Sequence, residues 1–124
     1  MYPFEKLATW RRAHRFAVEC YRAVEPLNDF SMRSQVRRAA TSIVANIVEG
    51  ASSQSQPEFS RLLGIAIASG NEADYHLLFC VDAGLLAPEI VAPLRSELRE
   101  VNLMLQGLRK AVRRNGGKKA GARN

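Results

Sequence analysis

Apolar residues recur every three or four positions along four stretches of this sequence, the spacing that lines one face of an α-helix. The stretches cover about residues 5–25, 32–49, 56–83 and 88–113. The fourth has the most regular seam, made of Leu94, Leu98, Val101, Leu105, Leu108 and Val112. No segment shows the alternation typical of strands. Because short connections place successive helices antiparallel, we expect an all-α fold, an antiparallel up-down-up-down four-helix bundle over residues 1–114.

The expected helix ends carry residues that cap or stop helices. Ser31 can accept a backbone amide hydrogen at the start of the second helix, and Gly50 can take the left-handed conformation that ends it. Residues 55–58, Ser-Gln-Pro-Glu, have the pattern of a capping box with proline in the first turn, and Gly84 can close the third helix. Pro93 either kinks the first turn of the fourth helix or moves the start of that helix to the residue before it.

Two features of the helix interiors predict packing. In the first helix the residues expected on the buried face are Leu7, Trp10, His14, Ala17, Tyr21 and Val24, and Phe16 and Cys20 widen that stripe. Gly70 lies in the middle of the third helix, where glycine costs about 1 kcal/mol relative to alanine. We therefore expect a neighbouring helix to pack closely against Gly70.

Length and cysteine usage fit a single intracellular domain. The chain has 124 residues, 47% of them hydrophobic, which is enough to bury one core without disulfides. Cys20 and Cys80 lie among apolar helical neighbours and form no zinc-binding pattern, so we expect both thiols to be reduced. The first residues lack the apolar core of a leader, and no run of eighteen apolar residues occurs. These features predict a cytoplasmic protein.

The net charge of +6 is unevenly distributed. Residues 1–38 carry +4, residues 39–108 carry −5, and residues 109–124 carry +7. Residues 115–124 contain no large apolar side chain, so we expect a disordered basic tail there. Basic ends of this kind favour a polyanionic partner, although they are also compatible with a surface that only aids solubility.

Basic residues follow one face of the first helix, open the second, and follow one face of the fourth. Since the first and fourth helices are neighbours in an up-down bundle, these rows could merge into one surface that contacts phosphates. A solvated face is an equally weighted interpretation. The candidate nucleic-acid-binding residues are Arg11, Arg12, Arg15, Arg22, Arg37, Arg38, Arg95, Arg99, Arg109, Lys110, Arg113 and Arg114.

The sequence gives little support for catalysis, a metal or a cofactor. A di-metal bundle would need Glu-x-x-His motifs, and neither His14 nor His76 has a glutamate three positions before it. His14 fits a packed histidine better than a ligand. Glu72 and His76 share a helix face and could form an acid/base pair, but an ordinary intrahelical hydrogen bond is the better interpretation. We therefore expect a protein that is not an enzyme.

A second stripe on the second helix is polar. It is made of Gln35, Ser42, Asn46 and Glu49, and Ser69, Glu72 and His76 form a matching stripe on the third helix. Half-buried polar groups need partners, so we expect these side chains to form a structural network that fixes helix register or an inter-subunit contact. A ligand site is the less favoured interpretation.

Residues 35–50, QVRRAATSIVANIVEG, resemble the Q-L-R-R-A-A-x-S-I-x-x-N-I-A-E-G signature of the small four-helix bundle proteins encoded in 23S ribosomal RNA intervening sequences. The flanking helices are similar too, so the resemblance spans about residues 4–112. The positions that match outside the signature are Phe4, Leu7, Trp10, Ala13, Phe59, Leu63, Ala66, Ser69, Glu72, Gly84, Leu85 and Leu86. Val48 departs from the usual alanine.

This resemblance implies a ring-like homopentamer. It also implies kinship to the accessory variability proteins of diversity-generating retroelements, which bind nucleic acid and a reverse transcriptase. Two functions are therefore expected to compete: a non-enzymatic oligomeric bundle that binds RNA or DNA through its arginine-rich surface, and a protein-interaction scaffold without a nucleic-acid role.

Overall fold

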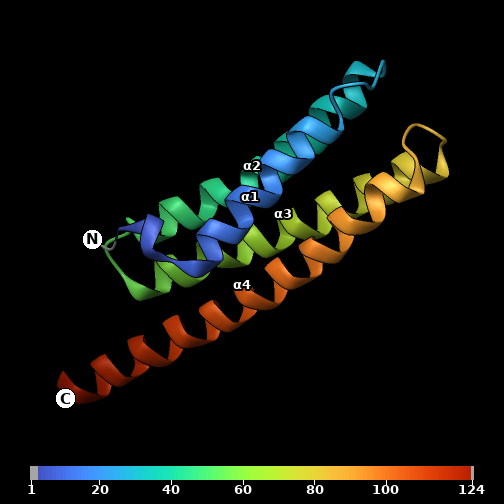
Figure 1. Ribbon diagram of the computed structural model, residues 1–124. Coiled ribbons are helices and arrows are strands. Elements are labelled where there is room, and N and C mark those ends of the chain that lie inside the picture. Colours follow the sequence, from blue (N-terminus) through green and yellow to red (C-terminus); the bar gives the residue numbers. More distant parts are fainter. Residues whose placement is uncertain (1–2, 124) are drawn as a thin grey trace.

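The computed structural model describes the backbone of residues 3–123 and the side chains of residues 3–115. Within that part of the chain the fold is all-α, as predicted. A short 3-10 helix, η1 (Phe4–Lys6), precedes the α-helices α1 (Ala8–Ala23), α2 (Phe30–Ala51), α3 (Gln56–Asp82) and α4 (Pro88–Arg123). Packing runs from α1 to α2, α3 and α4 and back to α1, which is the arrangement of an up-down-up-down bundle (Figure 1).

The core is a single cluster to which all four α-helices contribute. Its largest fully buried side chains include Phe16 of α1, Ile43 and Ile47 of α2, Leu63 and Leu77 of α3, and Leu98 and Leu105 of α4. The expected seam of the fourth helix is mostly buried, with Leu108 only partly so. No helix in residues 3–123 is both long enough and apolar enough to cross a membrane.

The face that α1 buries is rotated from the predicted one. Phe16 and Cys20, predicted at the edge of the stripe, form its centre together with Ala13, whereas His14 and Tyr21 are exposed. The apolar arc of this helix is wider than the core can cover, so the side chains on the edge toward α2 remain at the surface.

Both ends of α2 differ from the prediction. The side chain of Asp29, not Ser31, accepts the hydrogen bond from the Met32 amide at 2.9 Å. Gly50 is a buried helical residue, and the helix continues to Ala51. A Cβ at Gly50 would lie 2.6 Å from the Phe59 ring, so glycine is needed here for close packing and not for a left-handed turn.

The predicted ends of α3 are confirmed. Ser55 accepts a hydrogen bond from the Glu58 amide at 3.2 Å, but the Glu58 carboxylate pairs with Arg61, so only the Ser55 half of the expected capping box is formed. At the other end Gly84 has a φ of +74°, the only positive φ in the part of the chain that the structure describes. Hydrogen bonds from Gly84 to the Val81 carbonyl (3.0 Å) and from Leu85 to the Cys80 carbonyl (2.8 Å) complete a Schellman motif.

Close packing at Gly70 is also confirmed, because a Cβ there would collide with the Asn102 side-chain oxygen of α4. The helix α4 begins at Pro88 and contains Pro93 in its second turn. Its backbone stays helical to Arg123, where the sequence predicted a disordered tail from residue 115; residue 124 lies outside the described residues. Each residue added to an existing helix gains a hydrogen bond, so a helix can extend without a core contact. Figure 1 shows the last turns of α4 extending past the other helices.

Candidate functional site

Arginines of α1 hold the first helix to the fourth. Arg12 forms a two-point ion pair with Glu97 of α4, through Nε at 2.9 Å and Nη2 at 2.8 Å, and Arg15 lies 3.7 Å from the same carboxylate. The hydrogen bond from Arg12 lowers the pKa of Glu97 and raises the pKa of Arg12. The Glu97 carboxylate thus lies between the arginines of α1 and those of α4. It interrupts the single basic surface into which these two rows of arginines could have merged.

Arg95 and Arg37 are engaged in the same way. The guanidinium of Arg95 donates to both carboxylate oxygens of Asp74 on α3, at 2.7 and 3.3 Å. Arg37 lies 2.5 Å from the Glu25 carboxylate, donates to the Tyr21 carbonyl at 2.9 Å and stacks 3.6 Å above the Tyr21 ring. These arginines tie neighbouring helices together.

Eight of the candidate residues have no carboxylate within 4 Å among the described side chains. They are Arg11, Arg22, Arg38, Arg99, Arg109, Lys110, Arg113 and Arg114. Four of them lie within two turns of α4, and we call Arg109, Lys110, Arg113 and Arg114 the α4 basic cluster. The cluster is the densest group of unneutralised charge in residues 3–115.

Two members of the α4 basic cluster are fixed against α3. Arg109 Nε donates to the Ser60 carbonyl at 2.9 Å, and Arg113 Nε donates to Ser60 Oγ at 3.0 Å. Arg109 lies directly over Gly64, because a Cβ at that glycine would be 2.8 Å from Nη2. Each guanidinium makes this one hydrogen bond among the described side chains, so its Nη groups are left for another acceptor.

The polar stripes meet only in part. Ser42 and Ser69 hydroxyls lie 2.9 Å apart across α2 and α3, and Asn46 Nδ2 donates to the Ser42 carbonyl at 2.8 Å. Gln35 instead donates to Ser31 Oγ at 3.3 Å, and Glu49 is exposed. The network therefore links Ser42, Asn46 and Ser69.

Neither histidine forms a catalytic constellation. His76 is buried and its Nε2 lies 3.2 Å from Glu72 Oε1 within the same helix, which is the intrahelical pair expected. His14 is exposed and stacks on Trp10 with ring centroids 4.9 Å apart, so it is not the packed core residue that the sequence predicted. Within residues 3–115 no three His, Cys, Asp or Glu side chains gather in a way that could hold a metal ion.

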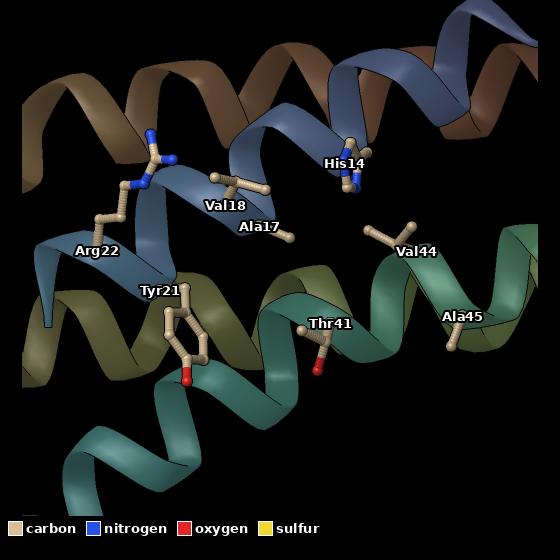
Figure 2. A pocket seen from close by; sticks show the side chains of 8 residues that line it. All are labelled: His14, Ala17, Val18, Tyr21, Arg22, Thr41, Val44 and Ala45. Carbon is tan, nitrogen blue, oxygen red and sulfur yellow. The ribbon is translucent and has the colours of Figure 1, made fainter. Parts of the chain in front are cut away.

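An apolar groove between α1 and α2 was not predicted. It encloses about 540 Å³ and is lined by His14, Ala17, Val18, Tyr21, Arg22, Thr41, Val44 and Ala45. Figure 2 shows Tyr21 reaching from α1 toward α2, and Val44 lying beneath His14. The sequence feature that could have predicted this groove is the apolar arc of α1, which is wider than the face that the core covers.

Comparison with known proteins places the chain among relatives of the same fold. Residues 5–107 match the family described as 23S rRNA-intervening sequence protein. The chain is also similar to a crystal structure of a protein of unknown function from the S23 ribosomal protein family of Bacteroides thetaiotaomicron. The two are 29% identical with a TM-score of 0.77, over 83% of this chain and 99% of the other. A search of curated proteins gave no significant match.

Proposed function

The chain belongs to the family of 23S rRNA-intervening sequence proteins, and from its charge distribution we propose that it is a non-enzymatic bundle that binds RNA or DNA through phosphate contacts. The α4 basic cluster is the observation that carries this proposal. Its four cations lie on one helix, and none is neutralised by a carboxylate within the described side chains. Unneutralised cations in register attract a polyanion and release its counterions on binding.

The size of the effect follows from the number of cations. If all four cluster residues each neutralise one phosphate of a single strand, the slope of log K against log salt is about −3. Affinity then falls roughly 50-fold between about 50 and 200 mM salt. Contacts of this kind carry little sequence information, so we expect similar affinities for unrelated sequences.

The test is fluorescence anisotropy of labelled single-stranded RNA and DNA across a salt series. We expect Arg114→Gln to weaken binding and to reduce the salt slope by about 1, because Arg114 is exposed and contacts no carboxylate. Arg15→Gln is the matched control, since Arg15 is exposed and lies beside Glu97, a carboxylate that stays paired with Arg12 when Arg15 is replaced. Affinity that does not change with salt, or absence of binding at low salt, would contradict phosphate recognition and favour the protein-interaction scaffold.

The proposed active form is a homopentamer. Besides the α1/α2 groove, the outer face of α3 carries Ile65, Tyr75 and Phe79, which are 39%, 59% and 39% exposed. Acidic Glu72 lies on this face, whereas Arg22 borders the groove. Since the two apolar surfaces lie on different sides of the bundle, a contact of one with the other is heterologous and can close into a ring.

Sedimentation equilibrium tests this assembly. We expect five times the 13.8 kDa of one chain, and we expect Ala45→Arg, which places a charge in the groove, to dissociate the ring. Thr41→Ser, a conservative change in the same groove, is the control. A wild-type chain that sediments as a monomer would rule out the pentamer.

A further inference from the structure

We propose that Arg109 and Arg113, held over α3 by Ser60 and Gly64, form a preorganised clamp for a backbone phosphate of the nucleic acid. The inference rests on the proposed function and deepens it, because it assigns phosphate contact to one place on α4. Among the eight candidate cations without a carboxylate, these two are the ones that donate a hydrogen bond through Nε, whereas Arg11 is held through Nη1 by the Glu5 carbonyl.

The clamp is preorganised because each guanidinium is anchored through Nε. Arg109 is bonded to the Ser60 carbonyl at 2.9 Å and Arg113 to the Ser60 hydroxyl at 3.0 Å, and Ser60 itself is buried. An anchored Nε fixes the plane of the guanidinium, and neither Arg109 nor Arg113 uses its Nη groups in a hydrogen bond to another described side chain or backbone atom. A side chain that is already fixed loses less conformational entropy when it binds a phosphate.

Gly64 makes the position of Arg109 possible. A Cβ at residue 64 would lie 2.8 Å from Nη2, 2.9 Å from Cζ and 3.3 Å from Nη1, so every heavy atom of the guanidinium beyond Nε would be in its way. The missing side chain thus lets the cation lie flat against α3. Gly107 of α4 offers a comparison, because a Cβ there meets nothing within 4 Å.

The electrostatic surroundings favour an anion at the clamp. Neither arginine has a carboxylate within 4 Å among the described side chains, whereas Arg12 and Arg95 do. Glu58, in the first turn of α3, is engaged by Arg61 through both of its carboxylate oxygens. That pairing lowers the pKa of Glu58, so its charge is present but already partnered. Two guanidinium groups with free Nη atoms match the oxygens of a phosphate.

The decisive experiment changes the clamp without changing the charge. Gly64→Ala displaces the Arg109 guanidinium, and Gly107→Ala makes the same chemical change in open space. Both replacements raise helix propensity by the same amount, so a difference in affinity between them does not come from helix propensity. We expect Gly64→Ala to weaken binding of a labelled single-stranded RNA on the order of tenfold, the effect of losing one charge-assisted contact, while Gly107→Ala binds like wild type.

A second variant keeps the proposal testable if Gly64→Ala disturbs the bundle. Ser60→Ala removes the hydroxyl that accepts from Arg113 but leaves the carbonyl that accepts from Arg109. We expect an intermediate loss of RNA affinity, with unchanged circular dichroism. Equal affinities of Gly64→Ala, Ser60→Ala and Gly107→Ala would overturn the clamp.

The outcomes for the clamp and for the proposed function are distinguishable. Salt-dependent binding by wild type with no effect of Gly64→Ala overturns the clamp alone, whereas no binding by wild type overturns both. The ligand of the clamp is either a phosphate of the nucleic-acid backbone or free inorganic phosphate. Adding excess inorganic phosphate at constant ionic strength distinguishes these two ligands. The difference between Gly64→Ala and Gly107→Ala persists if the backbone is the ligand, and its disappearance would show that the free ion occupies the clamp and overturn the proposal.

Discussion

Replacing Gly50 with alanine is expected to destabilise the protein, and the structure shows why. Gly50 is helical, so alanine gains about 1 kcal/mol of helix propensity. The new Cβ, however, would lie 2.6 and 3.0 Å from Cδ1 and Cε1 of the Phe59 ring, and 3.5 Å from Leu62 Cβ. Overpacking of this kind typically costs 1–3 kcal/mol, so the net loss should be about 1 kcal/mol. For a domain of this size that lowers the Tm by about 4 °C.

A double-mutant cycle with Phe59→Ala isolates the clash. Without the ring only the ordinary 3.5 Å contact to Leu62 remains, so Gly50→Ala should now stabilise by about 1 kcal/mol, a coupling of about 2 kcal/mol. Urea denaturation at one fixed protein concentration measures all four variants, since self-association would link stability to concentration. Gly107→Ala reports the helix-propensity gain by itself. If Gly50→Ala destabilises by the same amount with and without the ring, the packing explanation is wrong and a left-handed Gly50 is the better account.

Three further outcomes are expected. Ser55→Ala should lose about 1 kcal/mol because the Glu58 amide loses its acceptor, and Ser55→Asp should restore most of it in the same urea titration. Burial raises the pKa of Cys20 to about 12, so a thiol reagent at mildly alkaline pH should react with Cys20 only as fast as the protein unfolds. The hydrogen bond from Arg12 lowers the pKa of Glu97 in the folded protein below its ordinary value of 4.5. The Glu97 carboxylate therefore stabilises the fold at pH values above 4.5, and this stabilisation is lost as the pH falls through the lowered pKa. Glu97→Gln should therefore be less stable than wild type at neutral pH, and the two urea midpoints should converge in acid.

Local signals located the helices well. The cap at Ser55 and the left-handed turn at Gly84 were predictable because each depends on a few neighbouring residues. The same local rules failed at α2, where Asp29 and Ser31 are equally good cap residues two positions apart. Gly50 was ambiguous for a related reason, since a glycine near a helix end fits either a left-handed turn or a close contact. Only the position of Phe59, set by the packing of α3, separates the two.

The rotation of a helix about its axis was harder to predict than its ends. His14 and Tyr21 were placed in the core because they share a stripe with Ala17, yet they are exposed at the α1/α2 groove. A shift of some tens of degrees is enough to make that difference, because neighbouring residues are 100° apart on a helix. The pairing of the arginines depends on the same rotation. Arg95 shares a predicted face with Arg109, but its side chain meets Asp74 while Arg109 meets no carboxylate in the described residues.

The acidic partners decide which part of the basic surface can act on a polyanion. Beside the first half of α4, Glu97 of α4 neutralises Arg12 of α1, and Asp74 of α3 neutralises Arg95 of α4. The second half of α4, where the α4 basic cluster lies, has no Asp or Glu between residues 101 and 123. Exposed ion pairs contribute only about 0–1 kcal/mol to stability, so the paired arginines are weak evidence for either stability or binding. The cations of the α4 basic cluster have no carboxylate among the described side chains that would compete with a polyanion for them. A polyanion should therefore approach the bundle from the end at which α4 extends past its neighbours, and the arginines at the opposite end should contribute little to its affinity.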